Sequence, residues 1–186
     1  SKYPQDFPSV TPYTTMVSRN MISTVVEQLT YKNSVIDQNF LNSTKINYDY
    51  WNNNEWSSTP TNIIVPRTLD RRVKNQPDYE TRVQYNSYDD KGNLTTLSKD
   101  RDVKRSYIWG YDKMYPIATA INAASNEIFF DGLEETGGWI NVVGGWPEMA
   151  YDNQKHRSGR YSGKIYNPAN TELYYHSAKW LPITLN

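Results

Sequence analysis

The chain has 186 residues and a mass of 21.7 kDa, enough for one substantial domain or for one domain and part of another. Its 20 basic and 20 acidic side chains give a net charge of zero, and its mean hydropathy is −0.81. This charge balance argues against nucleic acid or an anionic bilayer as a partner. No stretch has the roughly 18 consecutive apolar residues of a membrane-spanning helix. The sequence therefore predicts a soluble chain that does not insert into a membrane.

The residue types restrict the chemistry that the chain can perform. There is no Cys, which excludes disulfides and thiolate zinc sites, and there are only two His. In contrast, 16 Tyr and six Trp supply large side chains that bury well when their polar atoms find partners. We therefore expect a folded, aromatic-rich domain. Because the chain begins with Ser1 rather than Met, we expect it to be a processed or trimmed piece.

The N-terminal residues predict an extended arm, a short helix and a strand. Three prolines within residues 1–13 each restrict the backbone, so this arm should be extended. Apolar residues at helical spacing predict a short helix over residues 14–20. The β-branched run that follows predicts a strand through Tyr31.

The next segment predicts further strands and a loop. Residues 35–40 and 45–51 have the composition of strands. Residues 52–60 are rich in Asn and Ser, which favour turns, and predict a loop. A strand over residues 62–65 is expected to end at Pro66, because proline cannot donate to a β-ladder.

The clearest pattern predicts a β-hairpin centred on residues 88–94. Side chains alternate over residues 82–87, which is typical of a strand with one buried face. In the turn, we expect the Asp90 carboxylate to cap the backbone and Gly92, next to Asn93, to take a positive φ.

Two more strands are predicted after this hairpin. A charged turn at residues 99–102 precedes a strand over residues 103–111, and another strand follows over residues 115–121. Aromatic side chains at every second position of the first of these strands predict an aromatic ladder on one face, suited to cross-strand pairing. The residues of this face are Val103, Arg105, Tyr107, Trp109 and Tyr111.

The same residues resemble a known family. A Tyr-Asp and Gly-Asn turn is followed by an aromatic strand and a Tyr-Pro tail (Tyr88, Asp89, Gly92, Asn93, Tyr107, Trp109, Tyr115 and Pro116). This unit, over residues 81–122, resembles the YD repeat of Rhs-type proteins. The N-terminal residues, with Tyr3, Pro4, Asp6 and Phe7, are similar to the lead-in of large surface lipoproteins of Bacteroidota that carry such repeats. The resemblance implies a strip of hairpins, and a single repeat does not predict the complete shell of multi-repeat relatives.

A second resemblance begins after a small polar linker at residues 122–126. Residues 129–139 and 158–163 resemble the start of carbohydrate-binding jelly-roll domains. A jelly roll has about eight strands. The remaining residues predict about five short ones, over residues 129–131, 139–143, 161–166, 172–175 and 180–185. The expected second domain is therefore a partial β-sandwich, cut short or unusually small.

Candidate binding residues fall in this second domain. Asp131 and Glu134 are candidates for a structural calcium site, since calcium prefers oxygen ligands and the resembled jelly rolls often hold one ion near this end. The alternative is a solvated acidic turn. Four aromatic residues could form a sugar-stacking platform, with core packing as the alternative: Trp139, Trp146, Tyr151 and Trp180.

No catalytic residue is predicted. Glu134 and Glu135 are neighbours in sequence and would point to opposite faces of a strand, so they do not form the carboxylate pair of a glycosidase. Neither His156 nor His176 accompanies a nucleophile elbow. We expect no cofactor apart from the candidate structural calcium.

Together these patterns predict a mainly β chain. We expect an antiparallel Rhs-like hairpin sheet with a short N-terminal helix over residues 1–125, followed by a partial, jelly-roll-like β-sandwich over residues 126–186. The expected role is a non-enzymatic structural or assembly module of a larger secreted or outer-membrane-associated bacterial surface protein. Its expected partners are other surface protein chains or further domains of its own polypeptide. The alternative is a carbohydrate-binding module whose partner is glycan, and a third class is an enzyme that uses carboxylates and Tyr alone.

Overall fold

The computed structural model of the chain describes residues 1–33, 39–128, 130, 148–152, 154 and 162–166. The chain divides into two compact units, Ser1–Ser106 and Tyr107–Asn186. The described residues are mainly β with one short α-helix, which confirms the predicted class. Among them, no helix has the length and apolar character needed to cross a bilayer.

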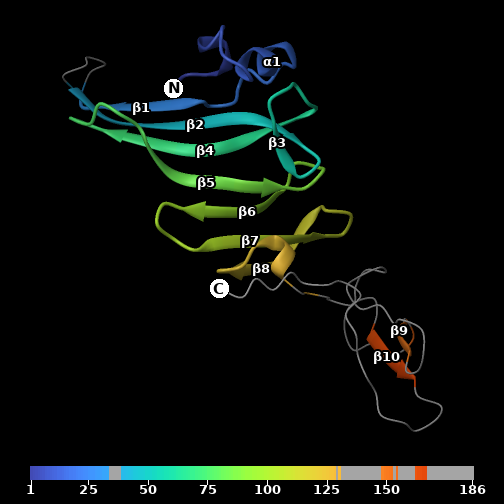
Figure 1. The fold of residues 1–186 in the computed structure, drawn as a ribbon. Helices are drawn as coiled ribbons and strands as arrows, with labels where there is room; N and C mark the ends of the chain where they lie inside the picture. The colour runs from blue at the N-terminus through green and yellow to red at the C-terminus, as the bar shows by residue number, and fades with distance from the viewer. Residues whose placement is uncertain (34–38, 129, 131–147, 153, 155–161, 167–186) are drawn as a thin grey trace. The chain divides into compact units, whose positions relative to one another are not determined.

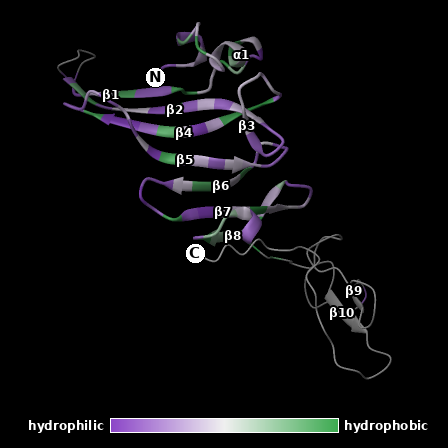
Figure 2. Ribbon diagram, viewed as in Figure 1, coloured by the Kyte–Doolittle hydropathy of each residue, from purple (hydrophilic) through white to green (hydrophobic). Residues whose placement is uncertain are grey.

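The main sheet is antiparallel, with strand order β1-β2-β4-β5-β6-β7-β8 and β3 added beside β2 (Figure 1). Except at β3, strands that pair follow one another along the chain, so the sheet is a series of hairpins. The strands are β1 (Glu27–Tyr31), β2 (Phe40–Asn52), β3 (Glu55–Ser57), β4 (Ile63–Val73), β5 (Glu80–Tyr88), β6 (Leu94–Lys99), β7 (Lys104–Gly110) and β8 (Tyr115–Ile121). Figure 2 shows that these strands carry both hydrophilic and hydrophobic residues along their length.

The N-terminal arm is less extended than predicted. A 3₁₀ turn, η1 (Pro4–Asp6), interrupts it, and the Asp6 carboxylate accepts a hydrogen bond from the Tyr3 backbone N–H at 2.7 Å. The predicted helix is confirmed as α1 (Tyr13–Ser18). The strand after the helix begins only at Glu27, where the backbone of Lys2 pairs with it as an antiparallel bridge.

The core of the first unit lies on both faces of β2. Tyr50 and Trp51 are 1% and 2% exposed, and adjacent strand residues point to opposite faces. On the Tyr50 face, α1 packs against the sheet through Tyr13 and Met16, with Val26 beside them. On the opposite face, Trp51 packs in a cluster of apolar side chains from β3, β4, β5 and β6, which includes Trp56, Val65, Tyr88 and Leu94.

Two predictions about β4 and the loop before it were wrong. β4 does not end at Pro66 but continues to Val73, because Pro66 lies at a register shift opposite Tyr48. A bulge leaves ladder positions unpaired, so the missing N–H of proline costs little there. The predicted loop over residues 52–60 contains β3, since Asn53 and Asn54 both have positive φ and form a tight turn between β2 and β3.

The β5–β6 turn has the predicted glycine, and Asp89 caps its backbone. Gly92 has φ +83, as expected. The Asp89 Oδ1 accepts the backbone N–H groups of Lys91 and Asn93, each at 2.9 Å, and the cap by Asp90 stays a prediction. The Asn93 side chain also donates to Asp89 Oδ2 at 3.0 Å. Asn93 thus belongs to the turn, as predicted.

The predicted strands after the hairpin are confirmed as β7 and β8. Ser106 and Gly110 are buried, whereas Val103 and Tyr111 at the ends of the expected aromatic ladder are exposed. In the second unit, Tyr111, Asp112 and Lys113 form the turn before β8, all with positive φ. The predicted strand over residues 161–166 corresponds to β10 (Ser162–Tyr166), which pairs with β9 (Glu148–Asp152).

Candidate functional site

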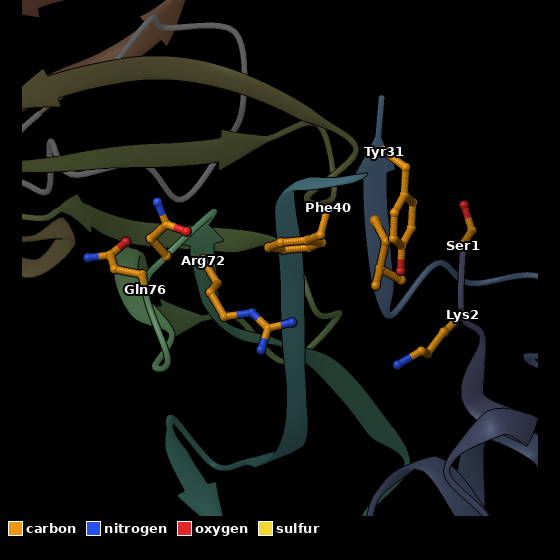
Figure 3. A pocket seen from close by; sticks show the side chains of 8 residues that line it. Ser1, Lys2, Tyr31, Phe40, Arg72 and Gln76 are labelled. Atoms are coloured by element: carbon orange, nitrogen blue, oxygen red, sulfur yellow. The ribbon is translucent and has the colours of Figure 1, made fainter. Parts of the chain in front are cut away.

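A cavity of about 790 Å³ lies at the β1, β2 and β4 end of the first unit (Figure 3). Strand register brings its walls together, because Tyr31 of β1 pairs with Phe40 of β2, and Arg72 of β4 pairs with Ser43 of β2. The described lining residues are Ser1, Lys2, Leu29, Tyr31, Phe40, Arg72, Asn75 and Gln76. The cavity therefore combines aromatic, amide and cationic side chains.

Aromatic rings hold the guanidinium of Arg72 in place. Its Cζ lies 4.9 Å from the Phe40 ring centroid and 5.1 Å from that of Tyr79, a double cation–π arrangement. Phe40 also contacts Tyr31 edge to face, with ring centroids 5.9 Å apart. Figure 3 shows Arg72 and Phe40 close together at the cavity, with Tyr31 and Lys2 on another side.

Arg72 has no acceptor for its hydrogen bonds in the described part of the chain. Its Nε is buried without a partner, and none of the ion pairs between described residues includes it. Guanidinium is a donor with five N–H groups, and a buried donor left unpaired is unfavourable. The cavity thus contains a planar positive charge that has no hydrogen-bond acceptor among the described residues.

A buried carboxylate network lies beside the cavity. Glu27 is 5% exposed, and it accepts hydrogen bonds from Ser43 Oγ at 2.8 Å and from the hydroxyl of Tyr79. Lys2 Nζ forms an ion pair with Glu27 Oε2 at 2.9 Å. Burial alone would raise the pKa of Glu27, but the hydrogen bonds from Tyr79, Lys2 and Ser43 outweigh it and hold this pKa below its ordinary value.

Two of the three partners of Glu27, Lys2 and Tyr79, have shifted pKa values in turn. The hydrogen bond to Glu27 raises the pKa of Lys2 above its ordinary value, and desolvation only partly opposes this. Burial raises the pKa of Tyr79, and its bond to Glu27 adds to the effect. Glu27 is therefore ionised at neutral pH, its donors are fixed, and it ties the N-terminal segment to β1 and β2. A carboxylate that stays ionised and keeps fixed donors is suited to a structural role rather than to general acid–base catalysis.

A second candidate site is the outer edge of β8. At the other end of the sheet, the start of the outer edge of β1 is covered, because Lys2 exchanges backbone hydrogen bonds with Val26 and Glu27. No described residue pairs with the outer edge of β8, the last strand in the order. Met114, Tyr115 and Ile121, at its ends, are 62–64% exposed.

Most of the binding residues predicted from sequence lie outside the described residues. This holds for the candidate calcium ligands Asp131 and Glu134, and for Trp139, Trp146 and Trp180 of the predicted sugar platform. Tyr151 is in β9, where its backbone pairs with Gly163 of β10. The calcium site and the platform therefore stay predictions. In the described residues, no group of three or more His, Asp or Glu is placed to hold a metal ion.

The sequence did not point to the cavity residues. Arg72 lies after Pro66, where the sequence patterns predict no strand, and Tyr31 and Phe40 are predicted only as strand residues. A signal was present, since Thr68, Leu69 and Val73 after Pro66 are strand-forming residues around a pair of arginines. The pairing of distant strands that makes the cavity is not visible in a local pattern.

Comparisons with protein-family models, with curated proteins and with solved structures each found no match to this chain.

Proposed function

We propose that the chain is a non-enzymatic structural module of a larger secreted or cell-surface bacterial protein, which assembles by adding a strand to the open edge of β8. The added strand would come from another surface protein chain or from a further part of the same polypeptide. A strand edge exposes a row of unpaired N–H and C=O groups, and such edges recruit other strands.

The observation that carries this proposal is the asymmetry between the two ends of the strand order. The backbone of Lys2 pairs with the start of β1, at Val26 and Glu27, whereas no described residue pairs with the outer edge of β8. Soluble proteins normally cover or blunt both edges, because an open edge leads to aggregation. An end strand with exposed Tyr115 and Ile121 and without Lys or Arg therefore favours a partner.

Pro116 indicates which backbone groups of β8 face the open edge. Within a sheet, proline is tolerated on an edge strand when its nitrogen points away from the neighbouring strand. Because N–H groups of alternate residues point to the same side, those of Ala118 and Ala120 should share the open edge with Pro116. The N–H of Thr119 should then point to β7. An added strand would pair from about Ile117 onward.

Amide hydrogen exchange of the intact chain, together with light scattering, tests this proposal. In the monomer, we expect the amides of Ala118 and Ala120 to exchange rapidly and that of Thr119 to be protected. If the chain associates, Ala118 and Ala120 should become protected, and Ala118→Pro should weaken association while the fold persists. Thr119→Pro is the matched control, which should instead disrupt the pairing with β7.

Two results would contradict the proposal. Strong protection of Ala118 and Ala120 in a monomer would mean that the chain covers this edge itself, and association unaffected by Ala118→Pro would exclude strand addition. The non-enzymatic part has a separate test, because hydrolysis of a glycan or ester that Glu134→Gln or Glu135→Gln abolishes would show an enzyme.

A further inference from the structure

We propose that the cavity between β1, β2 and β4 binds a small organic carboxylate that has a flat apolar face. The carboxylate would bind the guanidinium edge of Arg72, and the flat face would stack on one of the two rings of Phe40 and Tyr31, which stand at 74° to each other. This proposal is independent of strand addition at β8.

The charge of the cavity favours an anion. Lys2 and Arg72 line it, and none of the described lining residues is acidic. Lys2 is already paired with Glu27, whereas no ion pair between described residues includes the Arg72 side chain and its buried Nε has no acceptor. Its planar fork of N–H groups matches the two oxygens of a carboxylate.

The aromatic contacts explain why the guanidinium is available and how it is oriented. The ring centroids of Phe40 and Tyr79 lie 4.9 and 5.1 Å from Arg72 Cζ, as expected for rings that cover the faces of the guanidinium. The N–H groups of the guanidinium lie in its plane and are therefore left to donate hydrogen bonds. A guanidinium held in this way loses little conformational freedom when an anion binds, and such preorganisation favours affinity.

The remaining walls set the shape of the ligand. Leu29, Tyr31 and Phe40 provide apolar and aromatic surface, on which a ring or a sugar face can stack. The amides of Asn75 and Gln76 provide polar groups on another wall. The Gln76 amide nitrogen donates to Glu80, which leaves its oxygen as an acceptor for a hydroxyl group. A ring with hydroxyls and a carboxylate, or an aryl acid, has the matching chemistry.

Binding to the intact chain can be measured by calorimetry and by NMR with four probes: oligogalacturonate, benzoate, a neutral glucose oligosaccharide and inorganic phosphate. We expect at least one of the two carboxylates to bind more tightly than both the neutral sugar and phosphate, and to shift the signals of Phe40 and Arg72. Binding of oligogalacturonate alone identifies a sugar acid as the ligand class, and binding of benzoate alone identifies an aryl acid.

Matched variants locate the site. Arg72→Gln should weaken binding about tenfold or more, because a charge-assisted hydrogen bond is lost. Arg71→Gln removes the same charge from the adjacent, exposed position of β4 and should leave binding unchanged. Arg72→Lys keeps the charge but lacks the planar fork of N–H groups, so it should also weaken binding. This variant replaces Arg72→Gln in the test if Arg72→Gln does not fold. Phe40→Leu keeps an apolar residue without the flat ring and should weaken binding of the carboxylate.

Three outcomes would overturn the proposal. The first is that neither carboxylate binds. The second is that the neutral sugar or phosphate binds as tightly as the carboxylates do. The third is that Arg71→Gln weakens binding as much as Arg72→Gln does. In the last case only the net charge of the surface would matter. The failure of this proposal would leave the exchange behaviour of β8 unaffected.

Discussion

Gly92 shows how a single backbone conformation fixes a hairpin. Its φ of +83 lies in the region that residues with a Cβ rarely adopt. A Cβ at this position would also lie 3.3 Å from Cγ2 of Ile63, at the start of β4. The turn is therefore constrained both by its own backbone and by packing against another strand.

We expect Gly92→Ala to lower the free energy of unfolding by about 1–2 kcal/mol and Gly92→Val by more, since branching at Cβ adds to the strain at positive φ. Gly92→Asn is the matched control, because Asn tolerates positive φ but has the same Cβ contact with Ile63. Urea unfolding measures the decrease in the free energy of unfolding for each of the three variants. A Gly92→Val variant as stable as the parent would contradict the assigned turn.

Glu27 predicts a dependence of stability on pH. Its pKa is lowered in the folded chain, so the unfolded chain takes up a proton more readily. The stabilisation from this carboxylate is complete above the ordinary Glu pKa of about 4.3 and is lost as the pH falls through the lower folded value. Glu27→Gln should therefore cost about 1–3 kcal/mol at pH 7, as expected for loss of a charged hydrogen-bond acceptor.

The measurement is urea unfolding of the parent and Glu27→Gln between pH 7 and pH 2. The difference between their free energies of unfolding should be constant near neutrality and should shrink below about pH 4. Glu55→Gln changes an exposed carboxylate of β3 and should show almost no difference at any pH. A Glu27→Gln difference that grows on acidification would contradict the lowered pKa.

At the scale of elements, α1 depends on packing rather than on its own helical propensity. It has six residues, and isolated helices shorter than about 12 residues are marginal in water. Met16 is fully buried and Tyr13 is 4% exposed, both in the cluster with Val26. Thr15 Oγ1 and the Tyr50 hydroxyl form a hydrogen bond that adds a polar link to β2.

We expect Met16→Ala to cost about 2–4 kcal/mol of unfolding free energy, since a large buried side chain is removed. Val17→Ala, on the adjacent and exposed position of the same helix, should cost less than about 1 kcal/mol. Urea unfolding followed by Trp fluorescence compares the two variants. Equal losses would mean that α1 is not held by its buried face.

At the scale of the whole molecule, burial is concentrated in the strands around β2. Both β2 and β4 pair with strands on each side, and they contain the buried residues Tyr50, Trp51 and Val65. Tyr88 of β5 joins the same cluster and donates a hydrogen bond to the Pro66 carbonyl at 2.6 Å. Stability should therefore be distributed unevenly along the chain.

We expect the amides of β2 and β4 that bond to neighbouring strands to exchange most slowly in the chain. Protection follows burial and the number of contacts that must break before an amide is exposed. Hydrogen exchange with residue resolution makes the comparison, and Ala118 and Ala120 of β8, whose amides are proposed to face the outer edge, provide the reference that is expected to exchange rapidly. Slower exchange in β6 or β7 than in β2 would contradict this distribution.

Local sequence patterns predicted the elements whose causes are local. The strand alternation before residue 88, the short helix, the glycine at positive φ and the strand over residues 115–121 were all identified, because side-chain periodicity and turn chemistry act within a few residues. The mainly β class followed from the same patterns. Helix and strand ends shifted by a few residues, as between the predicted start near residue 21 and Glu27 in β1.

Tertiary structure decided the features that depend on distant partners. Pro66 remains inside β4 because the partner strand β2 accommodates a bulge there, and this pairing partner is 18 residues earlier in the chain. Asp89, which no local pattern singled out as a cap, accepts the backbone N–H groups of Lys91 and Asn93 in the turn between β5 and β6. The buried face of β7 likewise depends on β6, where Thr96 forms a hydrogen bond with Ser106 at 3.0 Å.

The sequence by itself thus determined a mainly β chain of hairpins, its aromatic composition and the positions of its clearest turns. Only the tertiary structure decided which rings surround Arg72, which carboxylate is buried and which strand edge no described residue pairs with. The physical reason is that alternation and turn propensity are properties of neighbouring residues, whereas burial and charge pairing arise between strands that meet after the chain has folded.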